Sequence, residues 1–559
     1  MSSVVSLGPK STCRPIAERH ARAVAALPRL ALAVVLLGFV ACGKRETAAE
    51  AGIKTGTLLV GNSSEPKDLD PQTIVAYTDA RLLFALFEGL TALDEATGQA
   101  VPAGAKTWET SPDGLTWTFH LDPAGKWSNG EPVTAADYVF AYRRILNPAF
   151  AAEYASMVYP LKNAQAYNSG KLKDATQIGA VAVDNLTLRL TLEEPCPWLI
   201  SLLAHQSWLP IPRAVVEKFG GGDKQGTAWT RPGNLVSNGP FFLKEWQPNA
   251  RVVLEKFPGY RAASLVKLNQ VIFFPIENPT TEEAAFRAGQ LHVTYTLPPD
   301  KIAGYRTEPS SRLRSNPTLS TYYINFNVKK APLDNTKVRR ALTLAIDRTG
   351  IAEKLLQGSR SPARSLVPDN TGGYTSHVQI PDDFAGAKAL LAEAGYPEGR
   401  GFPPLELQTG SGSTNKLINE AIQETWRREL GITVTIAELE QKTLFANAKA
   451  GAYQASSAGW VGDYVDPDTF LGVFLSDNGN NWSGWNNAEY DRLVHEAGRT
   501  LDTKSRQELQ QRAEAILLAE LPLAPTLHTQ GNYLIDPAVR GWKPSILGLN
   551  RYINIELRK

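Results

Sequence analysis

The sequence predicts an α/β fold, because short strand-like segments alternate with amphipathic helices along most of the chain. Residues 187–192 alternate polar and apolar side chains, as expected of a strand with one buried face. Residues 415–430 place apolar side chains three and four positions apart, as in a helix with one buried face. Helices lie between well-separated strands, which favours α/β lobes over a β-sandwich.

The remaining elements follow from the same two patterns, taken in chain order. The expected strands are 57–61, 116–121, 187–192, 251–255, 321–327 and 432–437. The expected helices are 337–347, 385–394 and 415–430. Gly395 and Gly431 follow two of these helices, where glycine commonly ends a helix. Thr134 is expected to cap a further helix, with Asp137 at its third position.

Residues 1–41 have the composition of a secretory signal. Four arginines between positions 14 and 29 precede the apolar run 30–40, which is shorter than the roughly 20 residues needed to cross a bilayer. Cys42 follows Ala41, an arrangement that resembles the lipobox of bacterial lipoproteins and implies lipidation of Cys42. Residues 42–56 are polar and small, and are expected to form a tether. The alternative is a plain signal peptide with an incidental cysteine.

Composition narrows the possible functions of the 559-residue chain. Lys and Arg total 58 against 56 Asp and Glu, so no basic excess indicates a nucleic-acid partner. Seven histidines make a metal-rich site less expected, and no cofactor is predicted. Cys196 lies between two prolines and is expected to be a buried, small apolar residue. Nothing in the sequence requires a dimer, so a monomer is the default expectation.

Motifs of common catalytic machinery are missing from the sequence. It contains no G-x-x-x-x-G-K-[ST] phosphate loop and no G-x-S-x-G nucleophile elbow. His495-Glu496 begins like a zinc-binding H-E-x-x-H motif, but Arg499 stands at the second histidine position. Asp463, Asp466 and Asp468 leave open a carboxylate pair of the kind used by glycosidases. The chain is therefore not expected to be an enzyme, and a secreted hydrolase is kept as a rival hypothesis.

An ordered series of short motifs spans nearly the whole chain after residue 56. The series is 65–71 (EPKDLDP), 86–90 (LFEGL), 111–119 (SPDGLTWTF), 126–137 (KWSNGEPVTAAD), 237–241 (SNGPF), 286–291 (FRAGQL), 322–327 (YYINFN), 331–335 (APLDN), 338–342 (VRRAL), 345–348 (AIDR) and 459–464 (GWVGDY). Each motif alone is weak, but the set in this order is specific. It resembles the peptide/nickel (family 5) extracellular solute-binding proteins of ABC importers, and most of all their periplasmic oligopeptide-binding branch.

That resemblance implies a periplasmic-binding-protein fold with two hinged α/β lobes and an additional inserted domain. The implied parts are lobe I (57–87, 213–319 and 530–559), domain II (88–212) and lobe III (320–529). Two crossing strands would form the hinge, and the ligand would lie between lobes I and III, which close over it.

The resemblance also implies a set of ligand-binding residues. A peptide of unspecified sequence offers its backbone, a terminal ammonium and a terminal carboxylate, and its backbone can be read by adding it to a strand. The positions matching the family's backbone-binding segments are Gly459, Trp460 and Val461 in lobe III and Val75, Ala76 and Tyr77 in lobe I. Asp463 matches the aspartate that holds the α-ammonium, while Tyr154 and Tyr295 match tyrosines near the ligand. For the tyrosines and Trp460, ordinary packing is the alternative.

The sequence departs from the family where basic residues meet the ligand carboxylate. The matching positions hold Leu356, Asn415, Ala448 and Ser457, none of which is basic, while Lys416 and Lys449 lie one residue away. The preferred ligand length is therefore open, and a cell-wall peptide is one alternative.

These expectations combine into one functional hypothesis. The chain is expected to be a lipid-anchored oligopeptide-binding protein on the periplasmic side of a bacterial membrane. It would deliver its ligand to an ABC permease that is driven by a separate ATPase. The alternatives are another family 5 solute, such as nickel, heme or an oligosaccharide, a secreted hydrolase, and a chaperone-like or adhesive role.

Overall fold

The computed structural model describes residues 46–309, 312–410 and 413–558. The predicted signal segment and Cys42 lie outside this range. Part of the predicted tether does not: residues Ala48–Thr55 form helix α2. This helix packs on the folded body, because the Ala49 N–H donates to the Gly289 carbonyl at 2.8 Å and Gly52 lies against His292. The prediction that the tether reaches residue 56 is therefore wrong, and the folded body begins near Ala48.

The N-terminal sheet has the strand order β1-β10-β9-β8. Its strands are β1 (Thr57–Gly61), β8 (Phe241–Gln247), β9 (Arg251–Lys256) and β10 (Gln270–Phe274). The helices in the neighbouring stretches of chain are α3 (Tyr77–Leu86), α7 (Arg213–Lys218), α8 (Pro279–Arg287) and α9 (Pro299–Arg306). β1 runs parallel to β10, so this sheet joins segments about two hundred residues apart in the chain.

The middle sheet, in contrast, is built from one continuous stretch of chain. It contains β4 (Ala105–Thr110), β5 (Thr116–Leu121), β7 (Thr187–Thr191) and β6 (Ala180–Ala182), in that order. Its helices are α4 (Ala135–Ile145), α5 (Ala164–Asn168) and α6 (Leu199–Leu202), and β2 (Thr91–Leu93) pairs with β3 (Ala100–Pro102) beside it. The predicted cap of α4 is present, since the Asp137 carboxylate accepts from the Thr134 backbone N–H at 2.8 Å.

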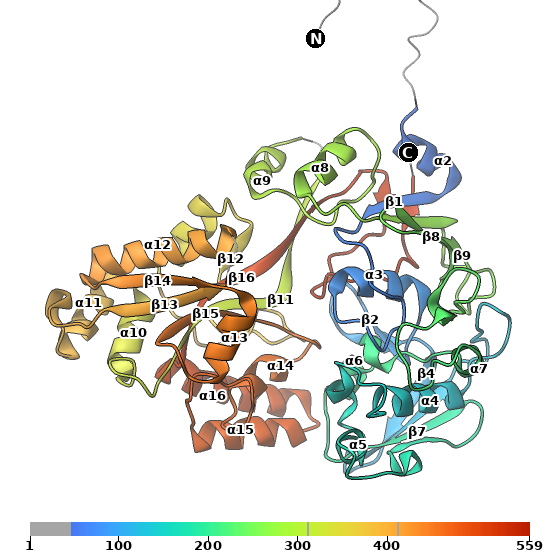
Figure 1. Cartoon of the computed structure of the whole chain (residues 1–559), viewed down its shortest axis with the longest axis horizontal. Coiled ribbons are helices and arrows are strands. Elements are labelled where there is room, and N and C mark those ends of the chain that lie inside the picture. The colour runs from blue at the N-terminus through green and yellow to red at the C-terminus, as the bar shows by residue number, and fades with distance from the viewer. Residues whose placement is uncertain (1–45, 310–311, 411–412, 559) are drawn as a thin grey trace, which may run out of the picture. The chain divides into compact units, whose positions relative to one another are not determined.

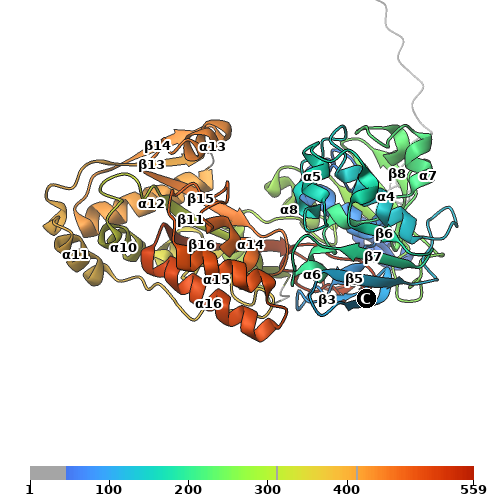
Figure 2. The ribbon, with the colours of Figure 1, turned by 90° about the horizontal axis from the view of Figure 1, so that it is seen from below.

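The large sheet has six strands in the order β12-β16-β11-β15-β13-β14. They are β11 (Leu313–Phe326), β12 (Arg360–Pro362), β13 (Leu405–Gly410), β14 (Val434–Leu439), β15 (Ala455–Val461) and β16 (Leu523–Leu534). The helices of this part are α10 (Thr336–Leu344), α11 (Phe384–Glu393), α12 (Ser413–Leu430), α13 (Gln441–Lys449), α14 (Asp468–Leu471), α15 (Ala488–Arg499) and α16 (Thr503–Glu520). α15 and α16 pack side by side (Figure 2), and a short C-terminal pair, β17 (Val539–Arg540) and β18 (Glu556–Leu557), completes the chain.

β11 and β16 connect the large sheet to the N-terminal sheet (Figure 1). At the far end of β16, the Leu534 N–H donates to Thr294 Oγ1 at 2.9 Å and the Thr294 N–H donates to the Leu534 carbonyl at 3.0 Å. The pairing of β11 with β16 is irregular between Pro317 and Thr321, where proline cannot donate to the ladder. The two strands therefore run between the two sheets, with one break in their ladder.

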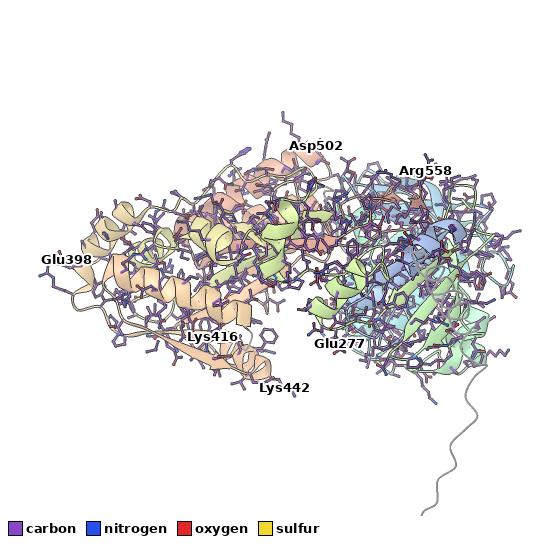
Figure 3. The ribbon with its side chains drawn as sticks, turned by 90° about the horizontal axis from the view of Figure 1, so that it is seen from above. Glu277, Glu398, Lys416, Lys442, Asp502 and Arg558 are labelled. Carbon is purple, nitrogen blue, oxygen red and sulfur yellow. The ribbon has the colours of Figure 1, made fainter. Side chains whose placement is uncertain are left out.

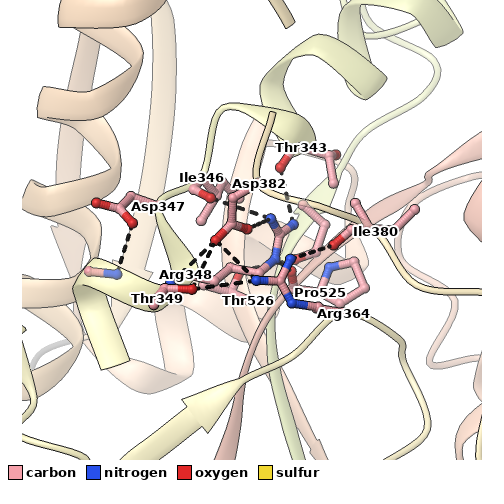
Figure 4. A network of polar contacts seen from close by, with 12 residues as sticks. Thr343, Ile346, Asp347, Arg348, Thr349, Arg364, Ile380, Asp382, Pro525 and Thr526 are labelled. Atoms are coloured by element: carbon pink, nitrogen blue, oxygen red, sulfur yellow. Dashed lines mark hydrogen bonds and ion pairs between the residues drawn. The ribbon is translucent and has the colours of Figure 1, made fainter. Parts of the chain in front are cut away.

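One family motif, Ala345–Arg348, serves the scaffold. The Arg348 side chain is fully buried and donates to Asp382 at 2.9 Å, to the Pro525 carbonyl at 2.7 Å and to the Thr343 carbonyl at 3.0 Å (Figure 4). These bonds tie the end of α10 to β16 and satisfy the guanidinium, whose burial without partners would be costly.

Within the described residues, no helix is long and apolar enough to span a membrane.

Candidate functional site

Asp463 is the acid at the centre of the candidate site. It follows β15 and Gly462, and its backbone N–H donates to Thr469 Oγ1 at 3.1 Å. Gly462 fits this turn because a Cβ atom there would lie only 2.5 Å from Cδ2 of Leu319. Among the described residues, the Asp463 carboxylate has no hydrogen-bond or ion-pair partner, and burial raises its pKa to about 6. The fold therefore holds a desolvated acid in a position where it lacks a cation.

Three cavities meet at Asp463. The largest has a volume of about 550 Å³ and is walled by Trp198, Trp460 and Tyr464. A cavity of about 30 Å³ lies against the segment 75–77. A third, of about 50 Å³, extends toward Phe84 and the C-terminal loop. A group bound at Asp463 would thus have space on several sides.

Two predicted tyrosines face the same acid. Tyr77 begins α3 and Tyr154 precedes a short 3₁₀ turn, yet both line the small cavity beside Asp463. Burial, followed by the nearby Asp463 carboxylate, raises the pKa of both hydroxyls. The Tyr154 ring meets His205 edge-on, with 5.3 Å between ring centroids. The phenols therefore surround the acid as neutral groups.

The segment preceding Asp463 is a strand with one open edge. β15 pairs with β11 along its whole length, but it pairs with β13 only at Ala455 and Ser456. Gly459, Trp460 and Val461 consequently have no strand beside them on the β13 side among the described residues. Gly459 and Val461 are exposed, although Gly459 lines none of the cavities at Asp463. An extended backbone can be added to such an edge.

The aromatic residues around the large cavity come from two sheets. Tyr464 stacks on Trp198 with ring centroids 5.8 Å apart and planes 6° apart. Trp460 is partly buried, and its Nε1 has no hydrogen-bond partner among the described residues. Across the same boundary, Arg499 forms an exposed ion pair with Glu194 at 3.4 Å. These contacts bring the middle sheet and the large sheet together beside Asp463.

A second substantial cavity, of about 400 Å³, adjoins the first set through Tyr77 and Leu547. It is lined by predicted residues Tyr295 and Val461, and also by Arg81, which the sequence did not indicate as a site residue. Its volume falls in the range of about 300–1,000 Å³ that is usual for ligand pockets.

The positions expected to hold a basic residue for the ligand carboxylate lie elsewhere. Leu356, Ala448 and Ser457 are buried, and neither they nor Asn415, Lys416 and Lys449 line the cavities at Asp463 or Arg81. Lys416 is exposed, and its side chain is labelled at the surface in Figure 3. A one-residue shift in the comparison with the family therefore does not bring a lysine into the site.

Sequence reasoning missed four groups that line these cavities. They are Arg81, His205, Gln206 and the C-terminal loop 545–550. None of these groups belongs to a motif. Burial lowers the pKa of His205 to about 3, and this burial is a property of the tertiary fold. No signal in the sequence alone distinguishes them from packing residues.

Two of the carboxylates considered for a hydrolase, Asp466 and Asp468, have partners within the protein. Asp466 is buried and forms an ion pair with Arg506 at 3.1 Å. Asp468 accepts a hydrogen bond from the Tyr464 hydroxyl at 2.7 Å, while burial, followed by Asp466, raises its pKa to about 7. Asp466 is thus committed to an internal ion pair that stabilises the loop following Asp463.

Comparison with known proteins decides the family. The family model for bacterial extracellular solute-binding proteins, family 5 (middle), matches residues 99–482, more than half of the chain. The chain belongs to this family. The resemblance predicted from the sequence motifs is therefore confirmed.

Relatives of this family 5 protein match it over most of their length. The periplasmic oligopeptide-binding protein OppA of Salmonella typhimurium is 35% identical over 512 residues, 89% of this chain and 92% of the relative. The probable deoxycholate-binding periplasmic protein YgiS of Escherichia coli is 35% identical over 491 residues, 86% of this chain and 89% of the relative. An unliganded open form of the periplasmic murein tripeptide-binding protein MppA has a TM-score of 0.81 at 32% identity, covering 90% of this chain and 98% of that chain.

The predicted fold class is confirmed by these structures. The family 5 chain has a mixed α/β, two-lobed binding-protein fold with an additional domain. Its relatives are substrate-binding proteins of the periplasm, which supports the periplasmic location expected from the sequence.

Proposed function

We propose that this family 5 protein binds peptides with a free α-ammonium group, which Asp463 holds, and passes them to an ABC permease. The observation that carries the proposal is the Asp463 carboxylate, which is desolvated, lacks a partner among the described residues and opens onto three cavities. An ammonium ion is the group that such an acid would bind most favourably.

The strength of that contact can be estimated from its chemistry. A charge-assisted hydrogen bond contributes about 1.5–3 kcal/mol, which corresponds to roughly 10–150-fold in affinity. The peptide backbone would extend along Gly459, Trp460 and Val461, and its side chains would occupy the cavities on either side of the strand.

The opposite wall of the site supports the same placement. Val75 and part of Tyr77 are exposed beside Asp463, while the Tyr77 hydroxyl is buried, and Tyr154 lines the small cavity that they share. Similarity to an unliganded open form, with a TM-score of 0.81, supports an arrangement that is ready to receive ligand. Closure of lobe I (57–87, 213–319, 530–559) on lobe III (320–529) would bring both walls onto the peptide, beside domain II (88–212).

Membrane attachment and transport belong to the same proposal. Lipidation at Cys42 would hold the protein at the periplasmic face, a permease with its own ATPase would receive the ligand, and one copy of the chain would suffice. In this proposal the protein catalyses no reaction and uses no cofactor.

Other solutes fit Asp463 less well. Oligosaccharides carry no cation for the acid, while heme and the deoxycholate named for one relative are anions that it would repel. Among the described residues, no group of three His, Cys, Asp or Glu side chains is arranged to hold a metal such as nickel. A cell-wall peptide with a free ammonium remains within the proposed class.

The test begins with native mass spectrometry of protein purified without refolding, in which a set of co-purified peptide masses is expected. Calorimetry with alanine peptides of two to six residues then compares the native protein with Asp463→Asn. We expect the substitution to weaken binding at pH 7.5 by about tenfold or more, because the charge-assisted contact is lost. Asp223→Asn, on an exposed loop, is the matched control and should bind as the native protein does.

Acetylation of the peptide N-terminus provides the complementary experiment. It removes the positive charge from the ligand, so it should weaken binding to the native protein by a similar factor and change little in Asp463→Asn. Equal binding of free and acetylated peptides would rule out Asp463 as the ammonium site. Preferential binding of deoxycholate, or turnover of a peptide, would rule out the proposed function.

A further inference from the structure

Arg81 is a buried cation on helix α3, which follows the first strand of the N-terminal sheet in the chain. It lies one turn after Tyr77 on α3, and only 6% of its surface is exposed. The apolar neighbours Leu82, Leu83 and Leu86 direct α3 into the core, yet Arg81 is buried with them. A buried guanidinium requires compensating partners, since burying a charge without them is strongly unfavourable.

The partners of Arg81 are incomplete. One of its nitrogens, Nη1, donates to the Gly61 carbonyl at 2.9 Å, and the guanidinium lies 5.0 Å from the centre of the Tyr295 ring. The guanidinium also interacts with the Tyr552 hydroxyl, a neutral group that does not balance its charge. Glu282 acts on it electrostatically, but this carboxylate accepts hydrogen bonds from the backbone N–H groups of Tyr295 and Thr296. Among the described residues, no carboxylate oxygen lies within 4.0 Å of the guanidinium, unlike Arg144, which pairs with Asp70 at 2.7 Å.

Arg81 also opens onto empty space. It lines the 400 Å³ cavity, and it is the only charged residue among the described residues that do so. The remaining lining consists of hydroxyl, amide, aromatic and aliphatic groups, among them Tyr295, Asn532 and Val461. A guanidinium offers a planar set of donors suited to a carboxylate, and its charge is not cancelled by another residue of this cavity.

The cavity is continuous with the space around Asp463. Tyr77 and Leu547 line both cavities, and the Asp463 carboxylate acts on the Tyr77 hydroxyl. Tyr77 and Arg81 are four residues apart on α3, a rise of about 6 Å along the helix. An extended peptide rises about 3.3 Å per residue, so a negative group at Arg81 and an ammonium at Asp463 suit a ligand of about two to four residues.

We infer that Arg81 binds the C-terminal carboxylate of a short peptide whose ammonium is held by Asp463. This inference rests on the proposed function, and it makes the chain a receptor for short zwitterionic peptides. Arg81 would take the place of the lobe III basic residues that the sequence lacks at positions 356, 415 and 448. An acidic side chain within the peptide offers the same chemistry, so the experiment separates the two sources of the carboxylate.

The experiment combines a change in the ligand with a change in the protein. Tri-alanine with a free C-terminus and tri-alanine amide are titrated into the native full chain, Arg81→Gln and Arg400→Gln. Arg400 is the matched control because its side chain is 73% exposed. We expect amidation to weaken binding to the native protein and to Arg400→Gln by about tenfold or more, as a lost charge-assisted bond would. In Arg81→Gln the acid should bind as weakly as the amide does.

Further ligands decide the source of the carboxylate and the length. The peptide Ala-Glu-Ala amide should bind as weakly as tri-alanine amide, and strong binding would overturn the terminal assignment in favour of an acidic side chain. In a series of alanine peptides, affinity should be highest at two to four residues, and a maximum at six would also overturn the inference.

Because the amide comparison uses the native protein, it holds even where Arg81→Gln folds poorly. Equal binding of tri-alanine and its amide to the native protein would overturn the role of Arg81 while leaving Asp463 in place. Failure of both forms to bind, with no peptide found by mass spectrometry, would overturn the proposed function as well.

Discussion

The Asp463 carboxylate is expected to lower the stability of the folded, ligand-free protein, because it is desolvated and has no cation beside it. Its pKa rises from 3.8 to about 6 because burial penalises the charged form. Near pH 7 the acid is nevertheless ionised, so the empty protein holds an uncompensated charge. A bound ammonium ion would replace the water that the carboxylate has lost. Ligand binding would therefore remove the destabilisation, and this gain contributes to the affinity.

Asp463→Asn should therefore stabilise the peptide-free protein at pH 7 by about 1–3 kcal/mol, the free-energy equivalent of the raised pKa. The folded pKa lies above the unfolded value, so the destabilisation is present above pH 6 and disappears as the pH falls from 6 toward 4. Urea denaturation at several pH values measures the difference between variant and native protein. The difference should shrink on acidification, and a variant less stable than the native protein at pH 7 would contradict the prediction.

At the level of single residues, the sequence indicated part of the candidate site. Asp463 and Tyr77 were predicted through their family motifs, and the fold places them beside the same cavity. Arg81 could not be predicted, because an arginine in a helix with leucines on one face is usually taken for a solvent-exposed residue. Its burial depends on Gly61 and Tyr295, which only the tertiary fold brings to it.

At the scale of the helix, the start of α4 provides a prediction independent of ligand. The Asp137 carboxylate accepts from the Thr134 backbone N–H at 2.8 Å and from its hydroxyl at 2.9 Å. Asp137→Ala should lower the free energy of unfolding by about 1–2 kcal/mol through loss of this cap. Denaturant unfolding measures the loss, with Asp223→Ala as the control, and tri-alanine affinity should stay unchanged. A loss equal to that of the control would show that the cap is dispensable.

Most elements were predictable where a local signal was strong. The strands expected at 57–61 and 116–121 are present with those bounds, and α12 ends at Leu430 before Gly431, as expected. The helix expected over 337–347 ends earlier, at Leu344, because the Asp347 carboxylate accepts from the Gly350 N–H at 2.8 Å and begins the next turn. Tertiary contacts, too, fold residues 48–55 into α2, although their composition suggested a tether.

At the scale of the whole molecule, ligand binding should draw the lobes together. Asp463 belongs to the part built on the large sheet and Arg81 to the part built on the N-terminal sheet, and β11 and β16 connect the two parts. A tripeptide that contacts both residues should therefore favour closure. Small-angle scattering should show a smaller radius of gyration with saturating tri-alanine than without it. Asp463→Asn should need at least a roughly tenfold higher peptide concentration for the same decrease, and an unchanged radius for the native protein would contradict closure.

The order of strands was beyond sequence reasoning. β1 pairs with β10 in parallel, and in the large sheet only β13 and β14 are neighbours both in the chain and in the sheet. Periodicity indicates that a strand is buried, but it does not identify its partner. The family motifs supplied this information only through resemblance to proteins with a known architecture.

The short unpaired stretch of β15 has a consequence for the protein in its empty state. Backbone groups at Gly459, Trp460 and Val461 that await a guest are also available to a strand of a neighbouring molecule. The stretch unpaired on this side is 457–461, but Ser457 is buried and Ala458 is half-buried, so only its last three residues offer a second copy an edge to pair with. A short open edge that suits a small ligand thus also disfavours strand pairing between ligand-free copies of the protein.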